Sequence, residues 1–485
     1  MVGMVLATNG CNVGPDFVRP KVALNEKWKQ SEDPRLKADA KIDTTWWRTF
    51  DDPTLDQLVD IAAHENLTLQ IAGLRILEAR GLLGIAVGEQ YPTNLGPAAS
   101  ASADHLSADA PNQANLDHNY GSFQVGFDAV WEIDFWGKFR RGVKAADGDY
   151  LATVADYDDA VVSLTAEVAR TYVQIRTFEA LIDLAQQNVA LQEEGQQIAQ
   201  SRFTNGATSE LDVDQATNLL ETTRGSIPKL QLSLQQSQNA LSTLLGRPTG
   251  YVQLMLTESR GIPKPPDQVA VSLPAELIRR RPDIRGAELR AYAQCQRIGV
   301  AKADLYPSFS LMGAFGTSTS VGTSNAAPLF DPSSFFANIG GGVFWPILNY
   351  PKIQANIHVQ DARFQEALVT YAFTVLKAAQ EVDDGIVGYL RQQDAVVFEQ
   401  NAVTAAQTAV ELALVQYREG SVDYQRVLDS QRVLLGSQND LTNTRSAATT
   451  NLIALYKALG GGWEVRKNSP VINERTNHDL EERSK

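Results

Sequence analysis

Cysteine and histidine, which build many catalytic and metal sites, are scarce in this sequence. The two cysteines, Cys11 and Cys295, lie far apart among 485 residues and form no CxxC pair, which argues against a disulfide framework. The five histidines are scattered without HExxH or paired metal spacing, and no GxSxG, Walker A or GxGxxG motif follows a strand-like stretch. We therefore expect a protein that is not an enzyme and that has no cofactor and no metal site.

Long apolar runs and an excess of basic residues are also missing. No run of 18 apolar residues occurs, so the sequence predicts no membrane-spanning helix. The chain carries 43 Lys and Arg against 57 Asp and Glu, a net charge of −14. This balance argues against nucleic acid as a partner, because neutralising phosphates requires clustered cations.

The chain is an internal duplication. At an offset of 214 residues, Arg202–Gly206 falls on Gln416–Gly420 and Trp131 falls on Trp345. Each copy has about 200 residues, far more than a solenoid repeat. The proline-rich stretch between the copies predicts a stiff crossing linker. The predicted domains are an N-terminal segment (1–53), the first copy (54–246), the linker (247–282), the second copy (283–463) and a polar, loosely ordered C-terminal tail (464–485).

Each copy predicts a helix followed by two strands. The helical stretches cover residues 54–90 and 283–305 and end at a Tyr-Pro pair, since the residue before proline is pushed out of the α region. Alternation with a period of two and one apolar face then predicts strands at 121–135, 308–315 and 335–345. The remaining strand, near 99–104, is only weakly patterned.

A long helical hairpin follows the strands in each copy. A mainly apolar position recurs every seven residues, eight times in each copy, and Gln196 is the one polar residue in the two series. This length corresponds to ~75 Å of helix, and the period indicates left-handed supercoiling. The two series are Val154, Val161, Val168, Ile175, Ile182, Val189, Gln196, Phe203 and Leu368, Val375, Val382, Tyr389, Val396, Val403, Val410, Tyr417. Each series meets a glycine suited to a helix C-cap, Gly206 or Gly420, and a second helix then returns to Gly246 or Gly460.

Four strands per chain cannot close a barrel, since about eight strands are the practical minimum. If their apolar faces meet lipid, several chains must pool their strands, and three chains would supply about twelve. The helical hairpins would then form a coiled-coil cylinder that continues the barrel. Such an assembly suits conduction of solutes and does not suit catalysis.

Local motifs resemble the TolC/NodT-type outer-membrane efflux proteins, in family order and over nearly the whole chain. They are Cys11–Phe17 with Pro20, Trp47–Phe50 with Asp52-Pro53, Trp131–Asp134, Leu273–Leu277, Arg281–Ile284 with Ala287-Glu288, and the turn at Gly420. The resemblance implies a mixed α and β fold, mostly α, in which four strands per chain contribute to a trimeric 12-stranded outer-membrane barrel above a long coiled-coil α-helical periplasmic barrel. It also implies a periplasmic membrane-fusion adaptor and an inner-membrane pump of the resistance-nodulation-division class as partners, besides outer-membrane lipid.

The same resemblance implies a gate at the periplasmic tip. By motif position, Asp429 falls where a ring aspartate sits, and Asp212 and Tyr417 fall where linking partners sit. Three symmetry-related carboxylates around a narrow axis would attract cations and repel anions. The alternatives are a solvated aspartate on a helix face, an aspartate that caps a helix beside the turn, and a tyrosine that forms the last layer of the heptad core. Arg426 and Val422 depart from some relatives, which carry a second acidic ring residue and a linking arginine there.

Further residues are assigned by position. The hairpin tips at Phe203, Gly206, Gly420 and Val422 are expected to contact the adaptor. Cys11, preceded by a glycine, is the expected lipid-anchor site of an outer-membrane lipoprotein with most of its mass in the periplasm; the alternative is a free cysteine in the N-terminal segment.

Aromatic residues gather where the strands lead into the helices. These residues are Trp131, Phe135, Trp136 and Trp345. They suit either the interfacial girdle of a membrane barrel or ordinary packing at the junction.

The cargo is the least determined part of the function. The sequence has no Met-rich or His-rich stretch that would signal metal transport, so efflux of drugs or other small solutes is the first hypothesis. Type I protein secretion and metal-cation efflux are alternatives. A periplasmic coiled-coil scaffold without a pore, and an enzyme using carboxylates such as Asp128 and Asp134, represent other classes.

Overall fold

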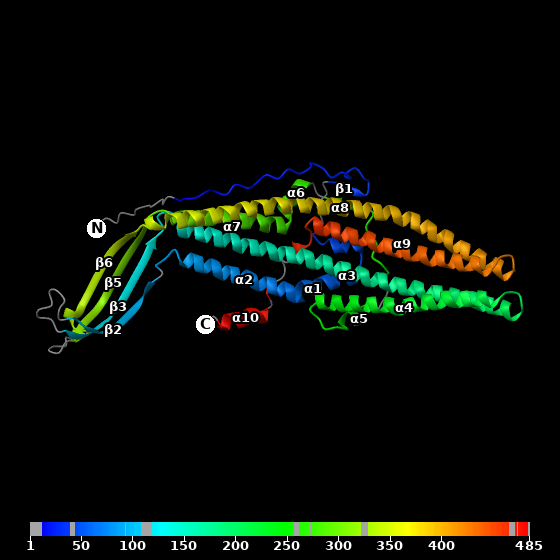
Figure 1. Ribbon diagram of the computed structural model, residues 1–485, viewed down its shortest axis with the longest axis horizontal. Coiled ribbons are helices and arrows are strands. Elements are labelled where there is room, and N and C mark those ends of the chain that lie inside the picture. Colours follow the sequence, from blue (N-terminus) through cyan, green and yellow to red (C-terminus); the bar gives the residue numbers. More distant parts are fainter. Residues whose placement is uncertain are drawn as a thin grey trace. The chain divides into compact units, whose positions relative to one another are not determined.

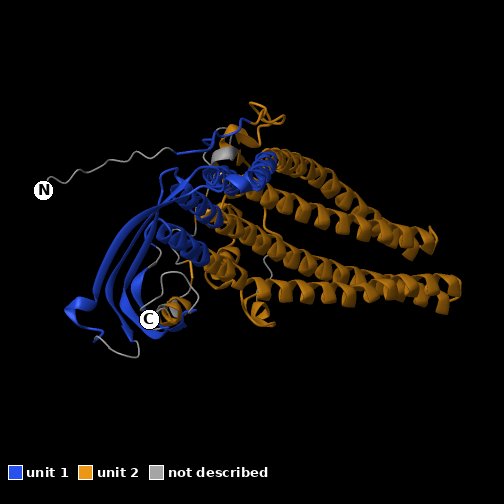
Figure 2. Ribbon diagram, turned by 60° about the vertical axis from the view of Figure 1, so that its left-hand side comes forward, with its two compact units in different colours: residues 1–21, 76–153, 286–371 blue, residues 22–75, 154–285, 372–485 orange. Residues whose placement is uncertain are grey.

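The computed structural model describes residues 12–38, 44–92, 94–107, 118–256, 261–271, 274–321, 328–464, 471–472 and 474–483. The chain divides into two compact units, coloured separately in Figure 2. Unit 1 comprises residues 1–21, 76–153 and 286–371, and unit 2 comprises residues 22–75, 154–285 and 372–485. Cys11 lies outside the described residues.

Unit 1 contains an antiparallel sheet with the order β2-β3-β5-β6 (Figure 1). The strands are β2 (Asn94–His105), β3 (Asn119–Ile133), β5 (Ser308–Val321) and β6 (Phe335–Phe344). The prediction of two strands from each copy is confirmed. The weakly patterned first strand is longer than the sequence indicated, because its whole length pairs with β3.

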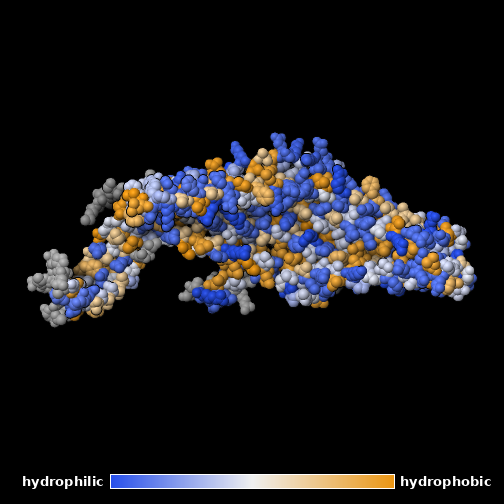
Figure 3. Space-filling model, viewed as in Figure 1, coloured by the Kyte–Doolittle hydropathy of each residue, from blue (hydrophilic) through white to orange (hydrophobic). Residues whose placement is uncertain are grey.

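One face of this sheet carries uncovered apolar side chains. Phe123, Val125 and Phe127 alternate along β3 and are 41–47% exposed. Phe127 pairs with Phe315 of β5, and their rings stack with centroids 5.4 Å apart. Hydrophobic residues are accordingly visible on the surface of the sheet and where α8 begins (Figure 3). The edge strands β2 and β6 each have one partner among the described strands, so the sheet combines open edges with an apolar face.

The helices before the strands are shorter than the sequence predicted in the first copy. The stretch 54–90 forms two helices, α1 (Pro53–Glu65) and α2 (Leu67–Gly88), interrupted at Asn66. In the second copy, α6 (Pro274–Arg280) precedes α7 (Pro282–Ala303). Short 3-10 helices cover Trp46–Phe50, Pro332–Ser334 and Ile347–Asn349.

The long helical hairpins are present in both copies, as the heptads predicted. The outgoing helices are α3 (Lys138–Thr204) and α8 (Tyr350–Arg418), and the returning helices are α4 (Glu210–Leu244) and α9 (Tyr424–Ala458) (Figure 1). The outgoing helices have 67 and 69 residues. Within the described residues, no helix combines the length and the apolar character needed to cross a membrane.

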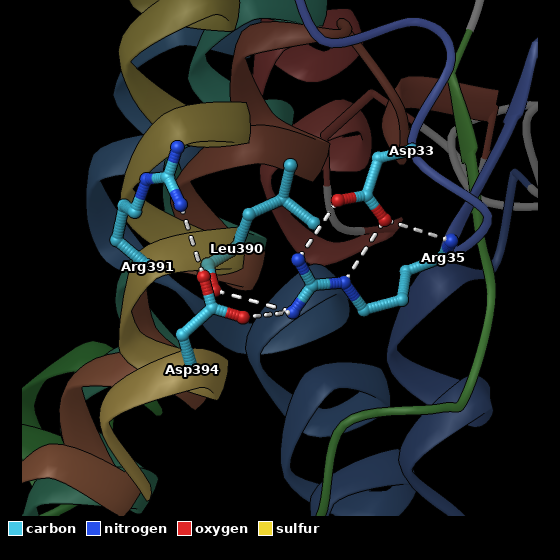
Figure 4. A network of polar contacts seen from close by, with 5 residues as sticks. All are labelled: Asp33, Arg35, Leu390, Arg391 and Asp394. Carbon is cyan, nitrogen blue, oxygen red and sulfur yellow. Dashed lines mark hydrogen bonds and ion pairs between the residues drawn. The ribbon is translucent and has the colours of Figure 1, made fainter. Parts of the chain in front are cut away.

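The predicted linker is more structured than its proline content indicated. It contains α5 (Tyr251–Met255) and β4 (Val269–Val271), and β4 pairs in parallel with β1 (Leu36–Ala38). Arg35, next to β1, ties this small sheet to α8 (Figure 4). Its Nη1 donates to the Asp394 carboxylate at 2.8 Å and to the Leu390 carbonyl at 3.3 Å.

The core of unit 2 is built around residues 46–53, which follow β1 in the chain. Trp46 is fully buried and stacks on Tyr456 of α9 with ring centroids 5.3 Å apart. The Asp52 carboxylate accepts from Thr54 N at 3.0 Å at the start of α1 and from the Tyr172 hydroxyl at 2.7 Å. This aspartate therefore caps one helix and fixes a second helix beside it.

The tail was predicted to be loosely ordered, and this is wrong for its described part. Residues Glu474–Arg483 form helix α10. The segment before it packs on α2: a methyl group added at Gly73 would overlap the carbonyl oxygen of Val471. No pattern in the sequence indicates this contact, because it depends on the absence of a side chain in a distant helix.

Candidate gate at the hairpin turns

The two hairpin turns of unit 2 have the same backbone construction. Gly206 and Gly420 both adopt the left-handed conformation, with φ of 71° and 79°. In the first turn Gly206 N donates to Phe203 O at 2.9 Å, and in the second Gly420 N donates to Tyr417 O at 3.0 Å. These are the bonds of a glycine C-cap, which satisfies the last carbonyls of each outgoing helix.

Tyr417 and Asp212, two of the three predicted gate residues, lie together at these turns. The hydroxyl of Tyr417, at the end of α8, donates to Asp212 Oδ2 in the first turn of α4 at 3.1 Å. Thr208 Oγ1 donates to the same carboxylate oxygen. The bond therefore joins a hairpin of the second copy to a hairpin of the first.

Tyr417 is both a core residue and a polar link, so the two interpretations of the sequence do not exclude each other. It is only 1% exposed and packs edge-on against Tyr424, with ring centroids 5.2 Å apart. Burial, followed by the charge of Asp212 and the hydrogen bond to it, raises the pKa of Tyr417 to about 12. The hydroxyl therefore stays protonated and able to donate at neutral pH.

Arg202 is a tip residue that the functional interpretation of the sequence missed. Its guanidinium lies 4.7 Å from the ring centroid of Tyr417, and its Nη1 donates to the carbonyl oxygen of Tyr417. The only signal in the sequence was a difference between the copies, because Arg202 aligns with the neutral Gln416.

Asp429 is separate from the Tyr417–Asp212 pair. It is exposed on α9 and accepts a hydrogen bond from Gln425 Nε2, one turn earlier, at 2.9 Å. The neighbouring Arg426 is also exposed. A single chain therefore presents this carboxylate to its surroundings, as expected both for a ring residue and for a solvated helix face.

The remaining tip residues differ in exposure. Phe203 is 38% exposed at the end of α3, and a methyl group added at Gly206 would meet no atom within 4 Å. Val422 is partly buried and packs against the core beneath the turns. The surface available to a partner thus comprises Phe203 and the glycine turns more than Val422.

The aromatic cluster of unit 1 joins strands to helices through indole hydrogen bonds. Trp131 donates to Gln90 O at 3.0 Å, Trp136 to Pro307 O at 2.8 Å and Trp345 to Leu305 O at 3.0 Å. Trp136 stacks on Tyr306, whereas Trp345 is 52% exposed. Trp136 therefore fits junction packing better, and Trp345 fits a girdle residue better.

The carboxylates considered for an enzyme do not converge. The Asp134 carboxylate accepts from Arg140 N at 2.9 Å and Phe139 N at 3.2 Å at the start of α3, which is a structural role. Asp128 is exposed on β3. Among the described residues, no group of three or more His, Cys, Asp or Glu is arranged to hold a metal ion.

Comparison with known proteins gives a consistent result over both copies. The family model described as outer membrane efflux protein matches residues 58–247 and 273–461. The chain is 28% identical to the cation efflux system protein CusC of Escherichia coli O6:H1 over 95% of this chain and 98% of that protein. It is 30% identical to the solvent efflux pump outer membrane protein SrpC of Pseudomonas putida, over 96% and 98%. The solved structure of the outer-membrane channel OprN is 30% identical, covers 94% of this chain and 100% of its own, and superposes with a TM-score of 0.87.

Proposed function

The chain belongs to the outer membrane efflux protein family, and we propose that three copies form a gated channel whose periplasmic end is closed by the hairpin turns. As a member of this family it is an outer-membrane efflux channel and not an enzyme. The proposal concerns the trimer, the gate, the cargo and the partners.

The sheet of unit 1 supports the trimeric barrel. Within the described part of the chain, its four strands leave two open edges, and its apolar side chains are uncovered on one face. Pairing β6 of one copy with β2 of the next removes the edges, and three copies supply about twelve strands, an even number within the range of outer-membrane barrels. The exposed Trp345 then lies in the interfacial girdle, next to outer-membrane lipid.

The hydrogen bond between Tyr417 and Asp212 is the main observation that supports the proposed gate. It ties the end of α8 to the start of α4, so the second hairpin cannot move away from the first while the bond persists. Opening a tube of hairpins requires such a relative movement. One buried hydroxyl and one carboxylate make a bond worth roughly 1–3 kcal/mol, strong enough to favour a closed state and weak enough to be broken by a bound partner.

Asp429 supplies the electrostatic part of the gate. Its side chain is exposed in the single chain, and three copies around the channel axis would form a ring of carboxylates. Such a ring would admit cations in preference to anions. Arg426, one turn before Asp429, would weaken this preference if it also faced the axis.

The cargo is proposed to be drugs or other small solutes. CusC is named a cation efflux protein and SrpC a solvent efflux protein, and the chain is about equally similar to both. The scarcity of Met and His favours the small-solute proposal over metal cations. Type I protein secretion is the second candidate. The expected partners are a periplasmic adaptor, which would meet the turns near Phe203, Gly206 and Gly420, and an inner-membrane pump of the resistance-nodulation-division class. Lipidation of Cys11 would add an anchor.

Single-channel conductance in a planar bilayer tests this proposal. We expect a small, cation-preferring conductance for the wild type and a clearly larger one for the Asp212→Ala/Asp429→Ala variant. Asp440→Ala, on the same returning helix α9, is the matched control and should behave as the wild type. Equal conductance of wild type and double variant would remove both aspartates from the gate. A folded protein that conducts in neither form would instead support the scaffold without a pore.

A further inference from the structure

Arg202 connects the end of α3 with the end of α8 at the hairpin turns. Its Nη1 donates to the carbonyl oxygen of Tyr417 and lies 3.5 Å from the carbonyl oxygen of Arg418. Its Cζ is 4.7 Å from the centroid of the Tyr417 ring. A methyl group added at Gly420 would lie 3.5 Å from both terminal nitrogens of the guanidinium. The arginine therefore lies directly against the second turn.

The first hairpin holds Tyr417 at three points. Asp212 of α4 accepts from the hydroxyl, while Arg202 of α3 contacts the ring and the backbone carbonyl. The hydroxyl can reach Asp212 only when both the backbone and the ring orientation of Tyr417 are correct. A planar guanidinium can stack on a ring and donate to a carbonyl at the same time, which a lysine ammonium cannot do with the same geometry.

The duplication provides an internal comparison for this contact. In the repeat alignment Arg202 corresponds to Gln416 and Tyr417 corresponds to Phe203. Both turns nevertheless have a left-handed glycine and the same C-cap hydrogen bonds. Folding of the turn thus requires neither the arginine nor the tyrosine. Of the two equivalent positions, only one carries the Arg–Tyr pair: Arg202 of the first hairpin contacts Tyr417 of the second, whereas the corresponding residues are Gln416 and Phe203.

We propose that Arg202 is a positioning residue of the gate, which holds Tyr417 so that its hydroxyl meets Asp212. The inference rests on the proposed function and adds to it a residue that contacts the ring and backbone of Tyr417. Without Arg202, Tyr417 would keep its core packing against Tyr424 but would lose the contacts that orient its ring and carbonyl. The closed state would then be weakened although the hydroxyl remains.

Single-channel recording of the full-length protein tests this role with a set of variants. Arg202→Gln introduces the residue present in the other repeat, so it is compatible with the turn. We expect it to raise the ratio of open to closed time by about tenfold, as for loss of a cation–π contact and one hydrogen bond. Arg202→Lys should give a ratio of open to closed time between those of the wild type and Arg202→Gln. If the glutamine variant does not assemble, the lysine variant tests the role of Arg202 in its place. Arg224→Gln is the control, because Arg224 bridges Glu193 and Glu221 within the first hairpin.

A double-variant cycle separates positioning from an independent tie. If Arg202 acts through Tyr417, Arg202→Gln/Tyr417→Phe should open no more than the stronger single variant. Full additivity of the two effects would overturn the positioning role. The positioning role would also be overturned if Tyr417→Phe opens the channel while Arg202→Gln leaves it closed. That result would still support the Tyr417–Asp212 gate. If neither single variant opens the channel, the gate itself is refuted, and the role of Arg202 falls with it.

Discussion

Asn66 and Arg281 occupy equivalent positions in the two repeats, whose offset is 215 residues in the segment before the strands, and each donates a hydrogen bond to the equivalent carbonyl at the end of a returning helix. Asn66 Nδ2 lies 2.8 Å from Leu244 O at the end of α4, and Arg281 Nη1 lies 2.8 Å from Ala458 O at the end of α9. The second repeat adds charge to this contact. Arg281 Nη2 lies 2.7 Å from Asp283 and 2.8 Å from Glu381. At this position the end of α9 is therefore held by an arginine within an ionic cluster, whereas the end of α4 is held by an amide, with the Arg247–Glu65 ion pair beside it.

Arg281→Gln should destabilise unit 2. The change leaves two carboxylates without their cation and removes a bond to a helix end, which costs about 2 kcal/mol of unfolding free energy. The matched control is Arg280→Gln, since the contacts of Arg280 with described residues, to Gly460 O and Glu464, are both long at 3.5 Å. Thermal or denaturant unfolding in detergent measures the difference. Equal loss in the two variants would contradict the assigned role of Arg281.

The Asp33–Arg35 pair should make the attachment of β1 sensitive to acid (Figure 4). The hydrogen bond from Arg35 lowers the pKa of Asp33 from 3.8 to about 2. Because the folded pKa is depressed, the stabilisation is present above pH 3.8 and is lost as the pH falls towards 2. Hydrogen exchange of residues 30–38 should therefore accelerate across this range in the wild type. In Asp33→Asn the exchange should be faster at neutral pH and lack this acid-dependent step; retention of the step would assign it to another group.

Gly73→Ala should release the C-terminal segment. Alanine favours helix formation over glycine by about 1 kcal/mol, so α2 itself should not suffer. The added methyl group would, however, overlap the carbonyl oxygen of Val471. Limited trypsin digestion should then cleave the region of α10 faster than in the wild type. Gly81→Ala, on the same helix with open space around the added carbon, is the control, and similar digestion of both variants would show that the contact is unimportant.

The long elements were predictable because their periods follow directly from geometry. A heptad series forces long packed helices, and the alternation at 121–135 forces a strand, so α3, α8 and β3 follow from local pattern. The interruption at Asn66 was not predictable. Its side chain accepts from Leu69 N and donates to Leu244 O, so the break depends partly on a contact with a distant helix. The pairing of β1 with β4 was also missed, since three residues per strand are too few to show a period.

The candidate site was predictable only in part. Motif position suggested Asp212 and Tyr417, and the geometry places their side chains in hydrogen-bond contact. Arg202 could not be found by the same reasoning, because its role depends on which ring lies beside it after the two hairpins pack. The difference between Arg202 and Gln416 was visible in the repeat alignment, but its meaning required the structure.

The most direct test of the central claim is the conductance of Tyr417→Phe, which deletes the single oxygen atom that joins the second hairpin to Asp212. The control is Tyr424→Phe, since Tyr424 is buried in the same core and packs against Tyr417. We predict that the Tyr417→Phe channel spends about tenfold more time open relative to closed than the wild type, as for loss of one buried hydrogen bond, while Tyr424→Phe gates as the wild type does. A Tyr417→Phe channel that remains as closed as the wild type would contradict a gate built on this bond.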